Sequence, residues 1–464
     1  NTSSTSSTLS VVVDITTPNA PVVLSITNDN GLSSTDEITN DQTLLITGTA
    51  EANSSVEVFI GGVSIGTTTA NGTGNWTYDH TGSTLAEGTY SITAEAKDAA
   101  GNTSSTSSAL SVKIDVTAPN APVVASISTD SGSSSTDELT NDQTLEFSGT
   151  AEAGSEVEVF IGGVSIGTTM ANGTGNWTYD HTGSTLAEGT YSITAEATDT
   201  AGNTSSTSSA LSIEIDVTAP NAPVVASIST DSGSSATDEI TSDQTLEFSG
   251  TAEANSTVEV FIGGVSIGTT TANGTGSWTY DHSGTTLSEG TYSVTAEATD
   301  GAGNTSNTSS TLSVVVDITA PNAPVVASIS TDSGRSNSDE LTNDQTLEIS
   351  GTAEANSSVE VFLAGVSLGT TTADGSGKWT YDHTGSSLAE GIHRFTAEAQ
   401  DAAGNTGTTS ANYWVRLHVT NPNAPALSSI ADDTGFDNSD NLTNDQTLSF
   451  SGTAEADALV SVYD

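Results

Sequence analysis

Apolar and polar residues alternate with a period of two in several short stretches of the chain, a pattern typical of β-strands with one buried face. In residues 115–215 the alternation occurs in QTLEFSGTA and EVEVFIGG, and it continues in VSIGTTM after a turn at Gly162 and Gly163. The runs NWTYDH, TYSITAEATD and SSALSIEI follow, with turn signals about every 8 to 12 residues. No window has the period of a helix. We therefore predict about seven short strands and no stable helix.

The same pattern recurs every 101 residues, and each copy begins at a short seam. The seam reads VDITTPNAP, IDVTAPNAP, IDVTAPNAP and VDITAPNAP around Asp14, Asp115, Asp216 and Asp317, and LHVTNPNAP around His418. Two prolines make it a short, semi-rigid connector, as expected at a domain boundary. We predict the last strand of a preceding repeat at 1–13, four repeats at 14–114, 115–215, 216–316 and 317–417, and a partial fifth at 418–464. The chain is thus interpreted as a window of a longer array.

A repeat of this length, with this strand pattern, predicts an all-β fold of tandem immunoglobulin-like β-sandwiches in an extended array. Tyr191, in LAEGTY, fits a tyrosine corner, as do Tyr90 and Tyr292, whereas the fourth repeat has Ile392 and His393 in LAEGIH. One tryptophan per repeat also keeps the spacing: Trp76, Trp177, Trp278 and Trp379. We predict that these indoles lie in the cores; the alternative is a sugar-stacking platform.

Composition restricts the function further. The chain has 58 acidic and 6 basic residues, a formal charge of −52, which repels nucleic acid and anionic membrane surfaces and attracts cations. The alternative interpretation of the charge is solubility or adaptation to salty water. There is no cysteine, so neither a disulfide nor a thiolate metal site can form. No apolar run is long enough to cross a membrane, so we expect no membrane insertion.

An acidic residue in each seam is unusual, because a linker needs no charge. At the same end of a sandwich, the loop between strands B and C and the loop between strands F and G offer a glutamate, an aspartate and an asparagine. Such hard oxygen ligands suit Ca²⁺, which takes about six to eight of them. The alternative is that D-x-A-G-N is only a favourable loop sequence. The predicted calcium ligands are Asp14, Glu51, Asp98, Asn102, Asp115, Glu152, Asp199, Asn203, Asp216, Glu253, Asp300, Asn304, Asp317, Glu354, Asp401 and Asn405.

A second acidic cluster lies between strands A and B, at the opposite end of each sandwich. By connectivity this loop faces the next seam, so a second cation there would brace the same joint; the alternative is a solvated acidic loop. The residues are Asp29, Asp36, Asp41, Asp130, Asp137, Asp142, Asp231, Asp238, Asp243, Asp332, Asp339, Asp344, Asp433, Asp440 and Asp445.

No set of catalytic residues is evident. His80, His181, His282 and His383 share one register in the YDH motif, but no nucleophile keeps a position beside them. We interpret these histidines as surface or packing residues and predict that the protein is not an enzyme.

The strings VDITAPNAP, GTAEANS, NGTGNWTYDH, LAEGTYSITAEATD and AGNTS, in this order, resemble the bacterial immunoglobulin-like repeats of very large surface adhesins. The resemblance implies type I secretion, an extracellular location at the bacterial cell surface, a role in attachment or biofilm formation, and calcium at the domain junctions. The implied ligands are the seam aspartates and the loop residues given above. His418 departs from the seam pattern, and neutral imidazole is a poor calcium ligand, so a weaker site is expected there.

The sequence therefore predicts a calcium-stiffened extender that projects a distal binding domain, with calcium ions and neighbouring repeats as its partners. The alternatives are a glycan-binding or surface-binding module and a subunit of a filament or surface layer. The fourth repeat differs from the others at Arg335, Lys378, Arg394 and Trp414, which marks either the edge of the near-identical block or a specialised face.

Overall fold

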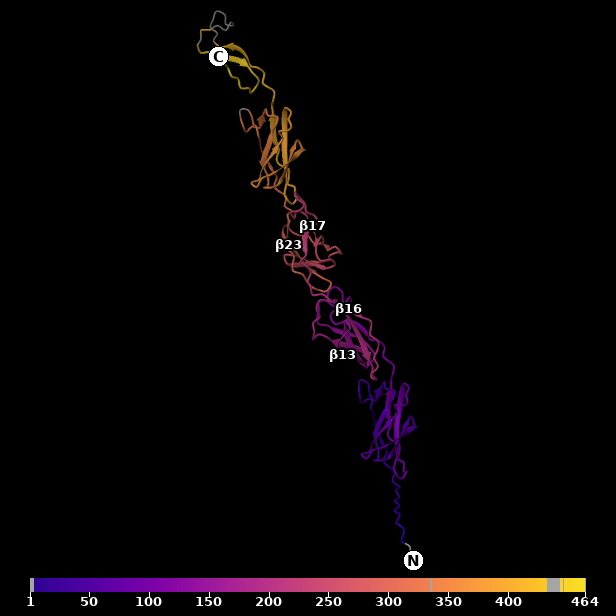
Figure 1. Cartoon of the computed structure of the whole chain (residues 1–464). Coiled ribbons are helices and arrows are strands. Elements are labelled where there is room, and N and C mark those ends of the chain that lie inside the picture. The colour runs from indigo at the N-terminus through magenta and orange to yellow at the C-terminus, as the bar shows by residue number, and fades with distance from the viewer. Residues whose placement is uncertain (1–3, 334–335, 432–442, 445, 464) are drawn as a thin grey trace.

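The computed structural model describes residues 4–333, 336–431, 443–444 and 446–463. Four sandwiches follow one another end to end along one line, with the two ends of the chain at opposite ends of the molecule (Figure 1). The secondary structure of the described residues is all β. None of these residues belongs to a helix that could cross a membrane. The predicted fold class is therefore confirmed.

Repeat 2 (residues 115–215) has two facing sheets. The strands are β9 (Val123–Ile127), β10 (Leu139–Thr140), β11 (Glu146–Thr150), β12 (Glu156–Ile161), β13 (Val164–Met170), β14 (Asn176–Asp180), β15 (Gly189–Thr198) and β16 (Leu211–Ile215). One sheet has the order β14-β11-β9 and the other β10-β16-β15-β12-β13. All pairs are antiparallel except β10, which runs parallel to β16. The two-residue strand β10 is additional to the seven predicted strands.

Repeats 1, 3 and 4 have the same two sheets with the same strand order. Repeat 1 comprises β1 (Val22–Ile26), β2 (Ile38–Thr39), β3 (Leu45–Thr49), β4 (Ser55–Ile60), β5 (Val63–Thr69), β6 (Asn75–Asp79), β7 (Gly88–Lys97) and β8 (Leu110–Ile114). Repeat 3 comprises β17 (Val224–Ile228), β18 (Ile240–Thr241), β19 (Glu247–Thr251), β20 (Thr257–Ile262), β21 (Val265–Thr271), β22 (Ser277–Asp281), β23 (Gly290–Thr299) and β24 (Leu312–Val316). Repeat 4 comprises β25 (Val325–Ile329), β26 (Leu341–Thr342), β27 (Glu348–Thr352), β28 (Ser358–Leu363), β29 (Val366–Thr372), β30 (Lys378–Asp382), β31 (Gly391–Gln400) and β32 (Tyr413–Leu417).

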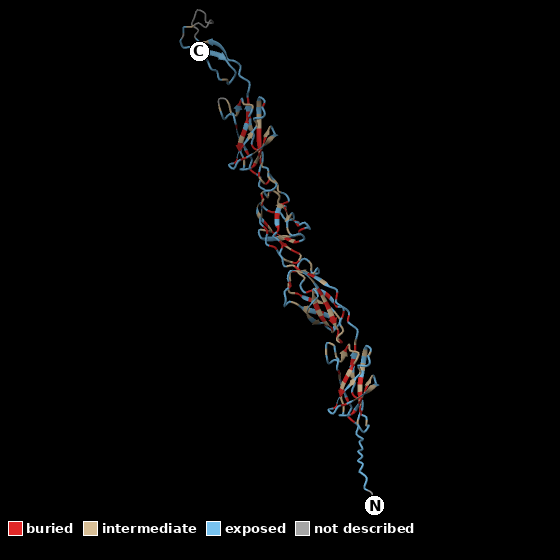
Figure 2. Ribbon diagram, viewed as in Figure 1, coloured by how far each residue is buried: buried red, intermediate tan, exposed pale blue. Residues whose placement is uncertain are grey.

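The core of each repeat lies between the two sheets, as the buried stripes along the strands show (Figure 2). In β12 the alternation of EVEVFI places Val157 and Val159 inside, both fully buried. Trp177 on β14 is 3% exposed and packs over Gly149. A Cβ at Gly149 would lie 2.7 Å from the indole ring, so this position has room only for glycine. The predicted core position of the tryptophans is confirmed, which removes the sugar-stacking alternative for them.

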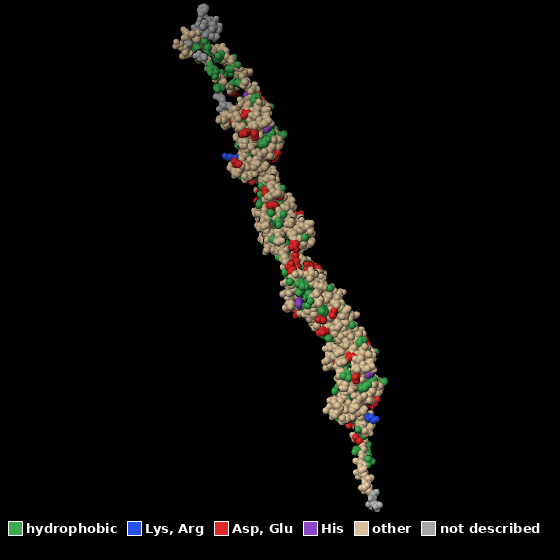
Figure 3. Space-filling view, viewed as in Figure 1, with side chains coloured by type: hydrophobic (Ala, Val, Ile, Leu, Met, Phe, Trp, Pro, Cys, Tyr) green, Lys and Arg blue, Asp and Glu red, His purple; other side chains and the backbone are tan. Residues whose placement is uncertain are grey.

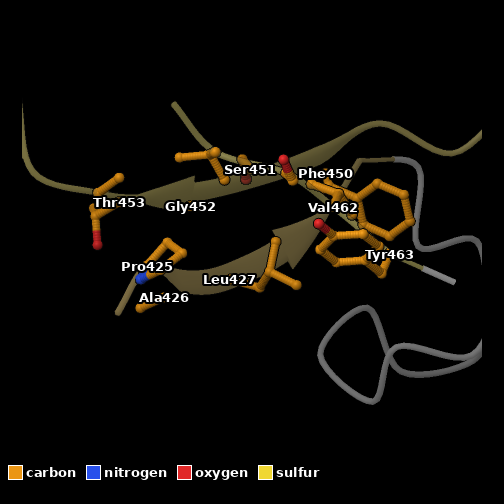
Figure 4. Close-up of a pocket in the computed structure, with 12 residues that line it drawn as sticks. Pro425, Ala426, Leu427, Phe450, Ser451, Gly452, Thr453, Val462 and Tyr463 are labelled. Atoms are coloured by element: carbon orange, nitrogen blue, oxygen red, sulfur yellow. The ribbon is translucent and has the colours of Figure 1, made fainter. Parts of the chain in front are cut away.

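The partial fifth repeat contains β33 (Ala426–Ile430) and β34 (Phe450–Thr453), which pair in an antiparallel manner. Phe450, Leu427 and Tyr463 line an open pocket of about 420 Å³ (Figure 4). Phe450 is 52% exposed, whereas its equivalent in repeat 3, Phe248, is fully buried. The pocket therefore corresponds to the core that the five-stranded sheet covers in a whole repeat.

Candidate functional site at the repeat junctions

The F–G loop of repeat 2, which connects β15 to β16, is built around a buried aspartate. Asp199 is 3% exposed. Its Oδ1 accepts hydrogen bonds from the backbone N–H groups of Ala201 and Asn203, both at 2.9 Å, and its Oδ2 accepts one from Nδ2 of Asn203 at 2.9 Å. Three N–H donors satisfy this carboxylate without a charged partner. The D-x-A-G-N sequence thus makes a closed loop, as its turn-forming residues favour.

The asparagine joins this loop to the seam. Nδ2 of Asn203 also donates to the backbone carbonyl of Asp115 at 2.9 Å. The same bond connects Asn304 to Asp216 at 2.9 Å and Asn405 to Asp317 at 2.7 Å. The structure therefore brings the predicted aspartate, asparagine and seam together, with the asparagine amide acting as the donor.

The F–G loops of repeats 2, 3 and 4 dock onto the A–B loops of repeats 1, 2 and 3. The A–B loop is the segment that lies between β9 and β11 in repeat 2 and between the equivalent strands of the other repeats. Between repeats 1 and 2, the backbone N–H groups of Leu32 and Asn40 donate to the carbonyls of Thr200 and Ala201, at 3.2 and 3.1 Å. Between repeats 2 and 3, Ser133 N–H and Ser131 Oγ donate to Gly301 and Ala302, at 3.2 and 2.8 Å. Ser234 N–H and Ser232 Oγ make the same bonds to Ala402 and Ala403. The expected position of the A–B loop beside the next seam is confirmed.

Burial shows how closely these loops fit. Ala201, Ala302 and Ala403 are fully buried in docked F–G loops, whereas the equivalent Ala100 of repeat 1 is exposed. At Gly132, whose φ is +105°, a Cβ would lie 1.9 Å from the carbonyl oxygen of Gly301. Glycine at this position lets the two backbones approach each other.

A second contact anchors the linker to the repeat that it leaves. In each linker, the threonine two residues after the seam aspartate donates its N–H to Oδ1 of that aspartate, at 2.9 Å for Thr218 and Asp216. The Thr218 hydroxyl also donates to Oε2 of Glu188 at 2.6 Å. Equivalent hydroxyl bonds join Thr117 to Glu87, Thr319 to Glu289 and Thr420 to Glu390. These glutamates belong to the motif LAEG, or LSEG in repeat 3, whose 101-residue recurrence was the signal that could have identified them.

The predicted glutamates belong to the B–C loops, which connect β11 to β12 in repeat 2. The residues Glu51, Glu152, Glu253 and Glu354 are all exposed. Asp300 and Asp401 repeat the arrangement of Asp199, each accepting from Nδ2 of its asparagine at 2.9 Å, and in repeat 1 Asn102 bonds Asp98 and Asp14 in the same way. Across the described part of the chain, no three His, Asp or Glu side chains are close enough to hold a metal ion together.

Acidic side chains line a hollow at the junction between repeats 2 and 3. Glu188, Glu214, Asp216 and Glu253 line a hollow of about 400 Å³. Figure 3 shows acidic side chains gathered where these two repeats meet. Two of the four, Asp216 and Glu253, are predicted ligands, and Glu188 and Glu214 are additional. Like charges gathered in this way repel one another unless a cation lies between them.

The A–B loops contain carboxylate oxygens without partners. Oδ1 of Asp29, Asp130, Asp231 and Asp332 is buried and accepts no hydrogen bond, whereas Oδ2 of Asp130 accepts the N–H of Glu138 at 3.2 Å. Burial, and then the charge of Asp130, raise the pKa of Glu138. An orphaned carboxylate oxygen beside a second carboxylate fits an oxygen-binding cation such as Ca²⁺ better than the F–G aspartates do. Asp433, Asp440 and Asp445 lie outside the described residues.

Two further expectations concern aromatic residues. The hydroxyl of Tyr191 donates to the carbonyl of Ala187 at 2.9 Å, as a tyrosine corner requires, and in repeat 4 Nε2 of His393 makes the same contact with Ala389 at 2.7 Å. His181 stacks on Tyr179 with ring centroids 6.3 Å apart, which agrees with a packing role for the YDH histidine.

Comparison with known proteins gives one family and several similar structures. The model of the bacterial Ig-like domain matches residues 16–116, 117–217, 218–318 and 319–416. A crystal structure of a tetra-tandem repeat in the extending region of a large adhesion protein is 25% identical, covering 83% of this chain and 98% of that one, with a TM-score of 0.33. A structure of a 1.5-MDa bacterial ice-binding adhesin is 24% identical, covering 59% and 91%, with a TM-score of 0.30.

A curated relative also matches in sequence. Exoglucanase B of Cellulomonas fimi is 32% identical over 274 residues, which are 56% of this chain and 22% of that protein. The chain thus spans about a fifth of the length of this relative.

Proposed function

Because this chain belongs to the bacterial Ig-like domain family, we propose that it is an extender region of a bacterial surface adhesin. In this role the repeats hold a distal binding domain away from the cell, for attachment or biofilm formation, and perform no catalysis. The proposal places the protein outside the cell, at the bacterial surface.

One observation carries the proposal: the same loops dock at each of the junctions between repeats 1 and 4. At each junction a backbone N–H of the A–B loop, of Leu32, Ser133 or Ser234, donates to a carbonyl of the following F–G loop, and the asparagine of that F–G loop bonds the seam. Contacts that recur in register restrain each pair of neighbouring repeats at the same loops. A spacer needs such a repeated, aligned joint rather than a different surface on each repeat.

We further propose that Ca²⁺ stiffens these joints. At the junction of repeats 2 and 3, Asp216, Glu253, Glu188 and Glu214 line one hollow, and these carboxylates would have to move closer together around the ion. Asp130, with its unpartnered oxygen, would hold a second ion in the A–B loop. Bound calcium would neutralise the repulsion between these groups. At about 100 times its dissociation constant, it would stabilise a folded repeat by roughly 2.7 kcal/mol per site.

Small-angle X-ray scattering of the 464-residue chain tests this function. The maximum dimension is expected to be long and fixed in excess calcium, and to shrink or broaden in excess EGTA. Magnesium at the same ionic strength is the control for general charge screening. Identical curves in calcium and EGTA, with no calcium detected by calorimetry, would remove the metal from the proposal. A compact particle under both conditions would remove the extender role itself.

A further inference from the structure

Repeat 4 differs from the other repeats at one end of its five-stranded sheet. Three positions that hold small hydroxyl residues elsewhere hold Ile392, Arg394 and Trp414 here. The replaced residues are Thr89, Ser91 and Ser111 in repeat 1, Thr190, Ser192 and Ser212 in repeat 2, and Thr291, Ser293 and Ser313 in repeat 3. Because the substitutions are neighbours on the sheet, they change one surface.

The register of the last two strands places these residues side by side. Arg394 on β31 lies opposite Trp414 on β32, and Ile392 lies opposite Arg416. Trp414 is 54% exposed and Ile392 is 68% exposed, whereas Val415, between the tryptophan and Arg416, is fully buried. The alternation puts the aromatic ring and both arginines on the outer face of the sheet.

This face adjoins an open groove of about 540 Å³ beside the hairpin between β28 and β29. Leu363 and Val366 of the hairpin line one part of the groove, and Ile392, Arg394 and Trp414 line the other. The Arg394 guanidinium extends over the hairpin, 3.7 Å from the position that a Cβ on Gly365 would occupy. The groove thus combines an exposed indole, aliphatic side chains and a guanidinium.

The charge of this surface contrasts with the rest of the chain. Repeat 4 holds four of the six basic residues: Arg335, Lys378, Arg394 and Arg416. The ion pairs found among the described residues involve neither Arg394 nor Arg416. Glu398, farther along β31, accepts a hydrogen bond from Thr409 at 2.5 Å. Two arginines without an acidic partner create a local positive region on a strongly acidic molecule.

We propose that this surface binds a polysaccharide whose sugar rings carry carboxylates. The apolar face of a sugar ring would stack on Trp414, and the planar fork of a guanidinium matches a carboxylate through two parallel hydrogen bonds. An open groove accommodates an extended polymer. A second copy of this chain fits less well, because each copy carries a formal charge of −52 and the two would repel each other.

Binding of polygalacturonate, a polymer of uronic acid, tests the proposal on the whole chain. The variants Trp414→Ser and Arg394→Ser introduce the residue that repeats 1–3 carry at the same position, so both are expected to fold. Lys378→Ser is the matched control: it removes a charge from β30, in the other sheet, and introduces the residue of repeat 3. Titrations in excess EGTA exclude calcium bridges between the polymer and the acidic junctions.

We expect wild type and Lys378→Ser to bind alike, and each groove variant to bind about ten-fold more weakly. Intrinsic fluorescence provides a second readout, because the other four tryptophans are 2–3% exposed, so the polymer should shift the emission of Trp414 alone. Three results would overturn the proposal: no binding by wild type, equal binding of neutral dextran, or unchanged binding by the Trp414→Ser, Arg394→Ser double variant. Self-association that depends on Trp414, measured by sedimentation, would identify a second copy as the ligand instead.

Discussion

The junction between repeats 1 and 2 and the junction between repeats 2 and 3 share one backbone contact, the bond from Leu32 or Ser133 N–H to the next F–G loop, but differ in charge beside the seam. Two residues before the seam aspartate, the first has Lys113 and the second has Glu214. Nζ of Lys113 lies 2.9 Å from Oδ2 of Asp115. Glu214 instead adds a fourth carboxylate to the hollow lined by Glu188, Asp216 and Glu253.

The pKa shifts at the first junction agree with an internal counter-ion. The hydrogen bond from Lys113 lowers the pKa of Asp115. The same bond raises the pKa of Lys113, and the charges of Asp199 and Glu152 raise it further. The ammonium group therefore lies in the field of three residues that were predicted as calcium ligands. We therefore propose that loop docking sets the geometry of a joint, while Lys113 or Glu214 decides whether the charge at the seam is balanced from within or by a cation from solution.

The largest effect is expected from breaking the docking itself. Gly132→Val places a Cβ against the carbonyl of Gly301, at a φ of +105°, where backbone strain alone costs about 1–3 kcal/mol. We expect the joint between repeats 2 and 3 to become a free hinge, with calcium present or absent. Small-angle X-ray scattering of Gly132→Val should show a broader distribution of molecular dimensions than that of wild type.

Gly173→Val is the control for this substitution, because no atom lies within 4 Å of a Cβ built at Gly173. If Gly132→Val scattered like wild type and Gly173→Val, the docking contact would not hold the joint.

Exchanging the two side chains should exchange the calcium dependence. Lys113→Glu removes the internal cation and adds a charge, so the joint between repeats 1 and 2 should require calcium to stay aligned. Glu214→Lys should make the joint between repeats 2 and 3 indifferent to EGTA. The Lys113 ion pair itself contributes only about 0–1 kcal/mol, because its lysine is 48% exposed, so the melting temperature should change little while the calcium response changes.

Distances across each joint in calcium and in EGTA measure this exchange. Lys113→Gln separates the loss of the cation from the gain of a carboxylate. A calcium response that stayed at its original joint in both variants would refute the role assigned to these positions.

The sequence predicted much of this arrangement, because the 101-residue recurrence exposed the seams, the F–G loop and the position of the A–B loop. It did not predict the direction of the hydrogen bonds. Asn203 was expected to offer an oxygen ligand, but its Nδ2 donates to both Asp199 and the seam. Spacing along the chain brings the residues together without specifying which atoms face one another. Binding of calcium by the predicted ligand set stays a prediction.

The smallest effect is expected on stability, from substitution of a glutamate in the A–B loops, which are present at both joints. Burial raises the pKa of Glu37 and of Glu138 above the ordinary value of 4.5. In repeats 1 and 2 the folded state therefore holds the proton of this glutamate more tightly than the unfolded chain does. The free energy of unfolding of these repeats falls as pH rises through the raised pKa. Glu138→Gln should raise the free energy of unfolding of repeat 2 at neutral pH without calcium by about a few tenths of a kcal/mol after solvent screening, which thermal unfolding would detect as a slightly higher melting temperature.

The difference between Glu138→Gln and wild type should vanish in acid. Glu37→Gln should behave in the same way in repeat 1, and Glu146→Gln, at an exposed strand position, is the control. A stabilisation that is independent of pH would show that titration of the carboxyl is not its cause.

The most direct test of the account is a pair of distance measurements by double electron–electron resonance. The chain has no cysteine, so spin labels can be placed at equivalent exposed positions with Ser83→Cys, Ser184→Cys and Thr285→Cys. We predict a narrow distance distribution between labels 184 and 285 in calcium that broadens in EGTA. Between labels 83 and 184, across the joint with Lys113, the distribution should stay narrow in both. Equal responses of the two joints to EGTA, or a broad distribution at either joint in calcium, would contradict the roles assigned to Lys113 and Glu214.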